Sequence, residues 1–74
     1  MIIGVPKEVK NNENRVGLTP NSVKLLSELG HSIFVQSQAG DAIGFSNDLY
    51  ESSGATILQD AEEVFTSSDL IIKV

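Results

Sequence analysis

The sequence predicts an α/β fold in which a mostly parallel sheet is flanked by helices. Short apolar segments rich in β-branched residues alternate along the chain with segments whose apolar positions recur at helical spacing. Signals that start and stop helices separate the two kinds of segment. This alternation is typical of parallel sheets, because each crossover between parallel strands is long enough to hold a helix.

Four apolar segments are predicted to form strands, at about residues 1–5, 33–36, 56–58 and 69–74. The first ends at Pro6, because proline has no N–H to donate to a sheet ladder. The second is apolar at consecutive positions, which is typical of a strand covered on both faces. The last segment also has the composition of a buried strand, and it carries Lys73 near its carboxyl end.

The first helix is predicted over residues 20–29. Thr19 is placed to cap its amino end, and Pro20 fits the first helical position, where a missing N–H costs nothing. Gly30 supplies the left-handed residue at which helices commonly end. Four apolar residues recur at helical spacing and define the expected buried face: Val23, Leu25, Leu26 and Leu29.

Two shorter helices are predicted in the second half of the chain. Ser46 starts a helix of about two turns that Gly54 ends, and Asp60 is placed to cap a third short helix. Glu62 and Glu63 lie near the positive end of that third helix, where their charges favour it. These two carboxylates therefore need no catalytic explanation.

Composition excludes several classes of protein. The 74 residues carry a formal net charge of −5 and make at most one small domain. No basic face is available for nucleic acid or anionic lipid, and no apolar stretch approaches the length of a membrane span. The absence of cysteine rules out a thiolate metal site and fits a cytoplasmic location. We expect a core this small to be completed by self-association, a partner chain or further sequence.

Residues 5–20 concentrate polar side chains in a pattern that suits neither a strand nor a helix, and we expect a loop that carries a site. This loop leaves the first strand at the carboxyl edge of the sheet, where open α/β sheets bind ligands. Arg15 is the candidate binding residue, because a guanidinium holds a carboxylate through two parallel hydrogen bonds. The neighbours at 12–14 are expected to orient it. From the residues alone, the alternative is a weak, exposed ion pair between Arg15 and Glu13.

Other polar and glycine positions point less strongly to a site. His31 follows the first helix and is expected to cap it or to face solvent rather than to act in catalysis. Gly40 and Gly44 lie in a turn-rich loop, but the G-x-G-x-x-G pattern of dinucleotide sites is absent. Lys73 is interpreted as a solubilising residue near a sheet edge.

The densest pattern, P-K-E-x-K-N-N-E-N-R-V-x-L-T-P at residues 6–20, is followed by G-H, G-F-S, G-A and a terminal I-K-V. Together these motifs resemble the amino-terminal end of bacterial alanine dehydrogenases, and the resemblance covers the whole chain. Proton-translocating nicotinamide nucleotide transhydrogenases share a looser form of the pattern. The K-N-N-E run is more similar to the dehydrogenase branch. Gln38, Ala42 and Ile43 depart from the usual pattern, which predicts a loop of different stiffness or shape there.

The resemblance implies that residues 1–74 are the amino-terminal part of a substrate-binding domain, an incomplete Rossmann-like or flavodoxin-like fold. In the parent family the reaction converts L-alanine, NAD and water to pyruvate, ammonia and NADH. Arg15 falls on the arginine that holds the carboxylate of pyruvate or alanine. The family's catalytic residues and its NAD-binding domain are expected to lie after residue 74, so that this chain alone is inactive. Lys73 does not match the family's substrate lysine.

Two alternatives to the dehydrogenase interpretation stay open. One is the corresponding segment of a transhydrogenase. The other is a non-catalytic α/β interaction module such as a phospho-receiver domain, which gathers acidic residues at strand ends to hold Mg²⁺. Glu8 is the only acidic residue that closely follows the first predicted strand, and Asp69 precedes the last strand instead of following it. We therefore expect no metal site.

Overall fold

The computed structural model describes residues 1–8 and 15–74 of the chain. These residues form a four-stranded sheet of order β3-β2-β1-β4, in which every neighbouring pair is parallel. The strands are β1 (Ile2–Val5), β2 (Ser32–Gln36), β3 (Ala55–Leu58) and β4 (Leu70–Ile71). The helices are α1 (Pro20–Glu28), α2 (Asn47–Ser52), α3 (Ala61–Ser67) and the short 3₁₀ helix η1 (Asp41–Ile43). The predicted parallel α/β fold is confirmed.

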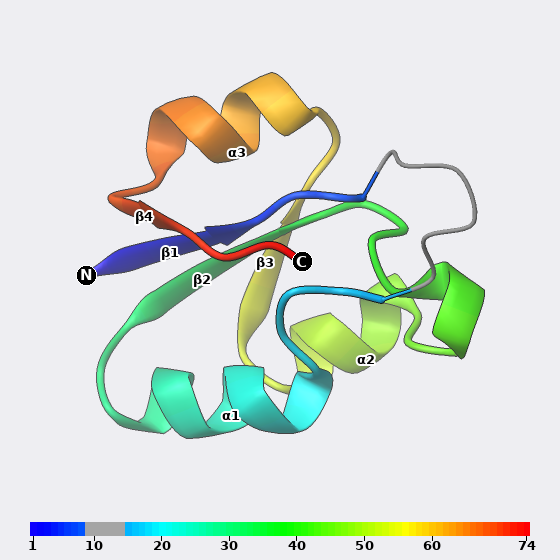
Figure 1. Ribbon diagram of the computed structural model, residues 1–74. Coiled ribbons are helices and arrows are strands. Elements are labelled where there is room, and N and C mark those ends of the chain that lie inside the picture. The colour runs from blue at the N-terminus through cyan, green and yellow to red at the C-terminus, as the bar shows by residue number, and fades with distance from the viewer. Residues whose placement is uncertain (9–14) are drawn as a thin grey trace.

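Helices cover both faces of the sheet. In Figure 1, α1 and α2 lie below the strands and α3 lies above them. Because side chains alternate across a strand, every second residue of β1 and β2 points to the α1/α2 face. The side chains that fill this layer are buried: Ile3, Val5, Val23, Ile33, Val35, Ala39, Tyr50 and Ala55.

The opposite face packs more closely against its single helix. Val64 of α3 is fully buried. A Cβ added to Gly4 of β1 would lie 2.8 Å from the Cγ1 atom of Val64 and closer still to the Ser68 hydroxyl. Contacts this short do not occur between real side chains. Glycine at position 4 is therefore what lets α3 approach the sheet.

The predicted start and end signals of α1 are confirmed. The Thr19 side chain accepts a hydrogen bond from the Ser22 N–H at 3.2 Å, and Gly30 has a φ of 97°. The His31 N–H then donates to the Leu26 carbonyl at 3.2 Å, which completes the turn typical of glycine-terminated helices. The His31 residue is partly exposed, and its Nδ1 atom is buried with no hydrogen-bond partner among the described residues.

The expected buried face of α1 is wrong in part. Val23 is buried and Leu26 packs against the core, but Leu25 and Leu29 are 65% and 74% exposed. Successive helical positions are about 100° apart, so Leu25 lies on the far side of the helix from Val23. Leu25 and Leu29 share an exposed face because they are four positions apart.

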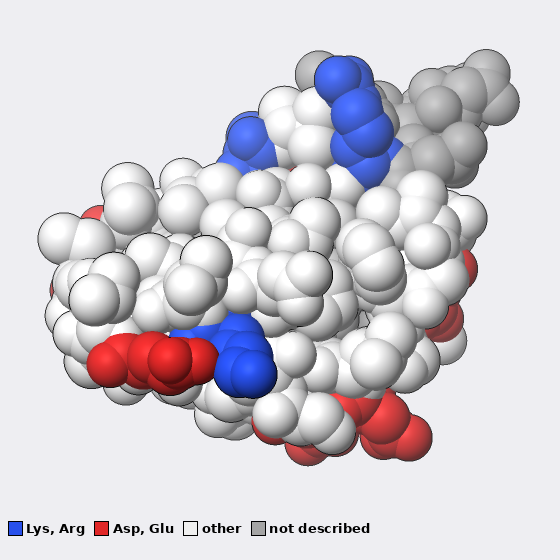
Figure 2. Space-filling model, turned by 90° about the horizontal axis from the view of Figure 1, so that it is seen from below, with Lys and Arg blue, Asp and Glu red and all other residues white. Residues whose placement is uncertain are grey.

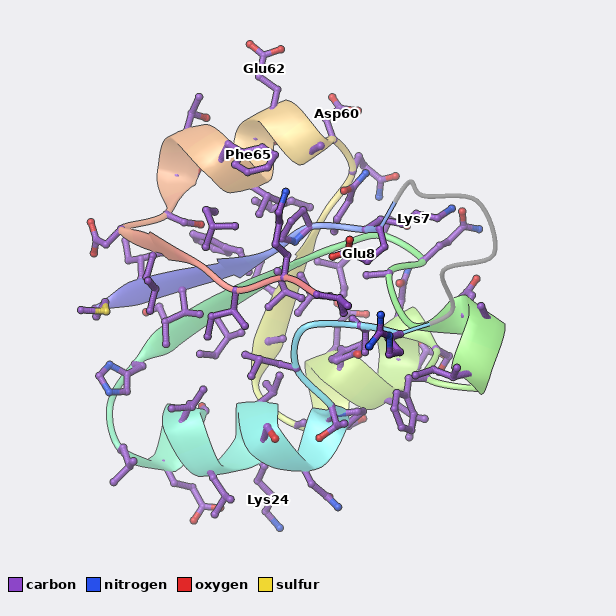
Figure 3. The ribbon with its side chains drawn as sticks, viewed as in Figure 1. Lys7, Glu8, Lys24, Asp60, Glu62 and Phe65 are labelled. Atoms are coloured by element: carbon purple, nitrogen blue, oxygen red, sulfur yellow. The ribbon has the colours of Figure 1, made fainter. Side chains whose placement is uncertain are left out.

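The starts of α2 and α3 differ. Ser46 caps α2 as predicted and accepts a hydrogen bond from the Leu49 N–H at 3.3 Å. Asp60 is the N-cap residue of α3 as predicted, but its side chain makes no capping hydrogen bond. Figure 3 shows Glu62 pointing away from the sheet, as a helix-favouring surface acid would. No described helix has the length and apolar character that crossing a bilayer would require.

The last strand is shorter and more exposed than predicted. Only Leu70 and Ile71 pair with β1, and Leu70 is 44% exposed. The Ile72 N–H still donates to the Gly4 carbonyl at 2.9 Å. One further rung would need an N–H from Pro6, which proline lacks. The ladder therefore stops there, and β4 forms an edge of the described sheet.

Candidate functional site

The candidate site lies at the carboxyl edge of the sheet, beside β1. The chain leaves β1 to reach β2 on one side, while β4 joins β1 from the other side. In open α/β sheets the crevice that binds ligands forms where the strand order reverses in this way. The loop that follows β1, which carries Arg15, starts at this edge of the sheet (Figure 1).

A cavity of about 250 Å³ lies at this edge and brings together residues that follow β1 and residues that follow β2. Arg15 is exposed and lines it. The other lining residues are Lys7, Glu8, Gln38, Ala39, Asp41 and Ala42. The residues at 12–14 that were expected to orient Arg15 lie outside the described part of the chain. Figure 2 shows basic side chains beside the segment drawn in grey.

The first turn after β1 is held by the neighbouring strand. The Lys7 N–H donates to the Gln36 side-chain oxygen at 2.8 Å, which ties the loop to the end of β2. Glu8 follows, and one oxygen of its carboxylate accepts the Val74 N–H at 3.1 Å. In Figure 3 the two side chains point in different directions, with Glu8 turned back over the sheet and Lys7 turned outward. Residues on both flanks of β1 therefore fix its loop.

The opposite wall of the cavity comes from the loop after β2. Gln38 has a φ of 67°, in the left-handed region that non-glycine residues rarely adopt. Its N–H donates to the Asn47 side chain at 2.8 Å, and the Asn47 amide donates in turn to the Ser37 hydroxyl at 2.9 Å. These bonds hold the loop in its strained shape. The departure from the family pattern at residue 38 thus lies in the cavity wall.

The part of the loop after Arg15 is fixed by two close contacts. Gly17 lies so close to the Ile72 carbonyl that an added Cβ would be 2.9 Å from the carbonyl carbon and nearer to the oxygen. The Tyr50 hydroxyl donates to the Leu18 carbonyl at 2.8 Å. Burial raises the pKa of the Tyr50 hydroxyl to about 12. The ring packs edge to face against Phe45, with centroids 6.3 Å apart.

The arrangement suits a small anion with a polar substituent. Arg15 and Lys7 supply positive charge, and a guanidinium presents a fork of donors that matches a carboxylate. Glu8 and Asp41 supply negative charge on the same walls. Lys73 is exposed and lines a separate cavity of about 200 Å³ next to α3, together with Lys7 and Glu8. The cavity beside Arg15 is therefore the candidate carboxylate site.

Sequence reasoning selected Arg15 but missed the other charged residues of this cavity. The sequence pattern points to Glu8 only as a possible metal ligand and does not point to Asp41. The signal that would have found them is position: Lys7 and Glu8 come directly after β1, and Gln38 to Asp41 come soon after β2. Because the carboxyl ends of adjacent parallel strands share one edge, residues that follow them are expected to meet.

The acids do not assemble as they do in a phospho-receiver domain. Asp69 lies at the opposite edge of the sheet, where its carboxylate accepts the Ile2 N–H at 2.9 Å. Among the described residues there is no group of three or more histidine, cysteine or acidic side chains that could hold a metal ion. The receiver-like interpretation has no support in this geometry.

Three glycines near the site, Gly4, Gly17 and Gly40, do not fit a dinucleotide either. A pyrophosphate cradle needs glycines whose backbone is open to the ligand. Gly4 and Gly17, which flank the loop, are instead covered by Ser68 and by the Ile72 carbonyl, and Gly40 is covered by Phe45. We therefore assign no NAD contact to the described residues.

Comparison with known proteins gives one family. The family model described as "Alanine dehydrogenase/PNT, N-terminal domain" matches residues 4–74. Alanine dehydrogenase of Bacillus subtilis (strain 168) is 51% identical over all 74 residues, and that of Methanococcus maripaludis is 46% identical. The chain spans only 19% and 20% of the length of these two relatives.

Solved structures agree with the sequence comparison. An L-alanine dehydrogenase superimposes with a TM-score of 0.95 and 45% identity, over 99% of this chain and 20% of that one. A transhydrogenase from Sinorhizobium meliloti superimposes with a TM-score of 0.89 and 33% identity, also over 99% of this chain and 20% of that one. This chain therefore has the same fold as the matched segment of these two proteins, which is about 20% of each of their chains.

Proposed function

This chain belongs to the alanine dehydrogenase/PNT N-terminal domain family, and we propose that it forms the amino-terminal part of the substrate-binding domain of an NAD-dependent alanine dehydrogenase. The proposed reaction is the interconversion of L-alanine with pyruvate and ammonia. The observation that carries the proposal is Arg15, which lines the cavity at the carboxyl edge of a sheet that resembles an L-alanine dehydrogenase.

In this proposal Arg15 binds the carboxylate that pyruvate and alanine share. Two parallel N–H···O bonds from the guanidinium fix the orientation of the substrate as well as its position. Lys7 adds a second positive charge to the same cavity. Residues 1–74 contribute binding and orientation. The catalytic residues and the NAD-binding domain would come from sequence outside this segment, and the enzyme would act in the cytoplasm.

Replacement of Arg15 tests the proposal in the complete natural protein. Arg15→Ala removes one side of a charge-assisted pair, which costs on the order of 2–5 kcal/mol. The KM for pyruvate and for alanine should rise strongly, while the KM for NAD stays nearly unchanged. Arg15→Lys should recover part of the loss, because an ammonium keeps the charge but not the bidentate geometry.

A matched control is Lys24→Ala, which removes a positive charge from α1. Figure 3 shows Lys24 pointing away from the sheet, far from the cavity wall. This change should leave all three KM values as they were. If Arg15→Ala also leaves the substrate KM values and kcat unchanged, Arg15 is a surface residue and the site assignment fails.

The corresponding segment of a nicotinamide nucleotide transhydrogenase is the second candidate. It is favoured by the structural similarity to the Sinorhizobium meliloti protein, but at 33% identity against 45% for the dehydrogenase. Alanine-dependent formation of NADH separates the two functions. A complete protein that transfers hydride between nicotinamide nucleotides without alanine would overturn the dehydrogenase proposal.

We also propose that residues 1–74, as an isolated chain, associate with a second copy or with a partner chain through the β4 edge. Leu70 is 44% exposed on a strand that has no second neighbour in the described sheet. Edge strands of this kind pair readily with other chains unless a charge prevents it. Sedimentation equilibrium should show a dimer or larger species, and Leu70→Lys should shift it toward monomer. A stable monomer at high concentration would contradict the proposal.

A further inference from the structure

Glu8 joins the two parts of the molecule that meet at the Arg15 cavity. Its side chain is half-buried and lines that cavity. At the same time its carboxylate accepts the N–H of Val74, which is 66 positions later in the chain. Glu8 thus connects the loop after β1 to the chain that leaves β4.

The bond to Val74 replaces a rung that the sheet does not make. Beyond Ile72 the next bond of the parallel ladder is missing, because Pro6 has no N–H to donate to the Ile72 carbonyl. The following bond in register would run from the Val74 N–H to the Pro6 carbonyl, but the Val74 N–H donates to the Glu8 carboxylate, at 3.1 Å. A backbone N–H paired with an ionised acceptor makes one of the stronger kinds of hydrogen bond.

The Arg15 segment touches the same stretch of chain from the other side. Gly17 packs against the Ile72 carbonyl so closely that no side chain fits between them. Residues 72–74 therefore contact both Gly17, two residues after Arg15, and Glu8. The place of residues 72–74 relative to the cavity depends on both contacts.

We propose that Glu8 is a positioning residue for carboxylate binding. Its carboxylate holds residues 72–74 against the loop that carries Arg15, and so keeps the cavity in the shape that receives a small carboxylate. Glu8 does not contact the bound carboxylate, which its own charge would repel. This inference rests on the proposed role of Arg15.

Three variants of the complete natural protein test the proposal. Glu8→Ala removes the acceptor and should raise the KM for pyruvate roughly tenfold, given the usual strength of a hydrogen bond to a charged group. Glu8→Gln keeps an oxygen that accepts the Val74 N–H, so its KM should stay within roughly threefold of the wild type. Glu8→Asp keeps the charge but shortens the reach and should be intermediate. Glu62→Ala is the matched control, since this acid points away from the sheet (Figure 3).

Hydrogen exchange of the Val74 amide reports on the bond without any assay of activity. The exchange should be faster in Glu8→Ala and Glu8→Asp than in wild type and nearly unchanged in Glu8→Gln. Unchanged exchange in both Glu8→Ala and Glu8→Asp would overturn the proposal. If Glu8→Ala does not fold, the exchange of the Val74 amide in Glu8→Asp alone decides the test.

A double-variant comparison separates positioning from general stability. In the Arg15→Ala background, Glu8→Ala should add no further rise in KM, because both changes act on one binding event. The Glu8→Ala single variant, with Arg15 intact, is also compared with wild type. If it has a lower melting temperature but an unchanged KM for pyruvate, Glu8 has a purely structural role and the proposal is overturned. Equal damage by Glu8→Gln and Glu8→Ala would also overturn it. If Arg15→Ala alone has no effect on KM, the proposed function fails, and Val74 exchange still measures the Glu8 contact.

Discussion

The interior of the sheet and its carboxyl edge are held together by different physics. In the interior, the described buried side chains are apolar or aromatic, and they interlock on the two faces of the sheet. At the carboxyl edge, by contrast, side-chain oxygens accept backbone N–H groups from distant parts of the chain, as Glu8 does from Val74 and Gln36 from Lys7. Packing therefore determines the fold, while a few directional bonds shape the site.

This difference predicts that changes in the interior affect stability and that changes at the edge affect mainly binding. Tyr50 is fully buried under the α1/α2 layer. Tyr50→Ala should lower the free energy of unfolding by about 3–5 kcal/mol, as large aromatic truncations do. Chemical denaturation of the complete protein measures this change in the free energy of unfolding. Leu25→Ala, at a residue 65% exposed, is the control and should change stability by no more than about 0.5 kcal/mol. If Tyr50→Ala and Leu25→Ala lowered the free energy of unfolding equally, the proposed difference between interior and surface would be wrong.

The close approach of α3 gives a smaller interior effect. Gly4→Ala places a methyl group against Val64 and Ser68 and should cost about 1–3 kcal/mol of stability through overpacking. Ser68→Gly, added to Gly4→Ala, removes the nearest obstacle and should recover part of the loss. A double variant as unstable as Gly4→Ala would show that the α3 contact is not the cause.

Tyr50→Phe isolates the one described bond that runs from the buried Tyr50 side chain to the site loop. Loss of the bond to the Leu18 carbonyl should cost about 0.5–1.5 kcal/mol at neutral pH. The effect should also depend on pH. Burial raises the pKa of Tyr50 from 10.0 to about 12, so the unfolded chain loses this proton first as pH rises. The contribution is complete below pH 10.0 and is lost as pH rises through about 12.

Denaturation at several alkaline pH values checks this dependence. Between the unfolded and folded pKa values, the wild type should lose up to about 1.4 kcal/mol per pH unit because of Tyr50. Tyr50→Phe lacks the hydroxyl and should have a correspondingly flatter profile there. Parallel profiles in the two proteins would mean that other groups cause the alkaline loss.

The smallest effect is expected at the edge and has the opposite sign. Gln38 occupies a left-handed conformation with a φ of 67°. Gln38→Gly relieves that strain and should stabilise the protein by about 0.5–1 kcal/mol, after the greater freedom of glycine in the unfolded chain is subtracted. Gly44→Ala, at a φ of 85°, is the matched opposite and should destabilise. A Gln38→Gly protein that is less stable would show that the Gln38 side chain makes a compensating contact.

The local sequence determined much of the fold. Thr19, Pro20 and Gly30 set the ends of α1, because capping and left-handed conformations depend on a few neighbouring residues. The β-branched segments set β1, β2 and β3 within one or two residues. Arg15 could be selected because its chemistry and its place after the first strand are both readable along the chain.

Only the tertiary structure decided which residues meet. Leu25 and Leu29 have the spacing of a buried face, yet the packing direction of α1 leaves them exposed. The last strand reads as buried, but its place at the sheet edge exposes Leu70. The bond between Glu8 and Val74 joins residues 66 positions apart, and local propensity holds no information about such a pair. Burial and long-range contacts depend on how elements pack, so the sequence identified Arg15 while the fold supplied the cavity around it.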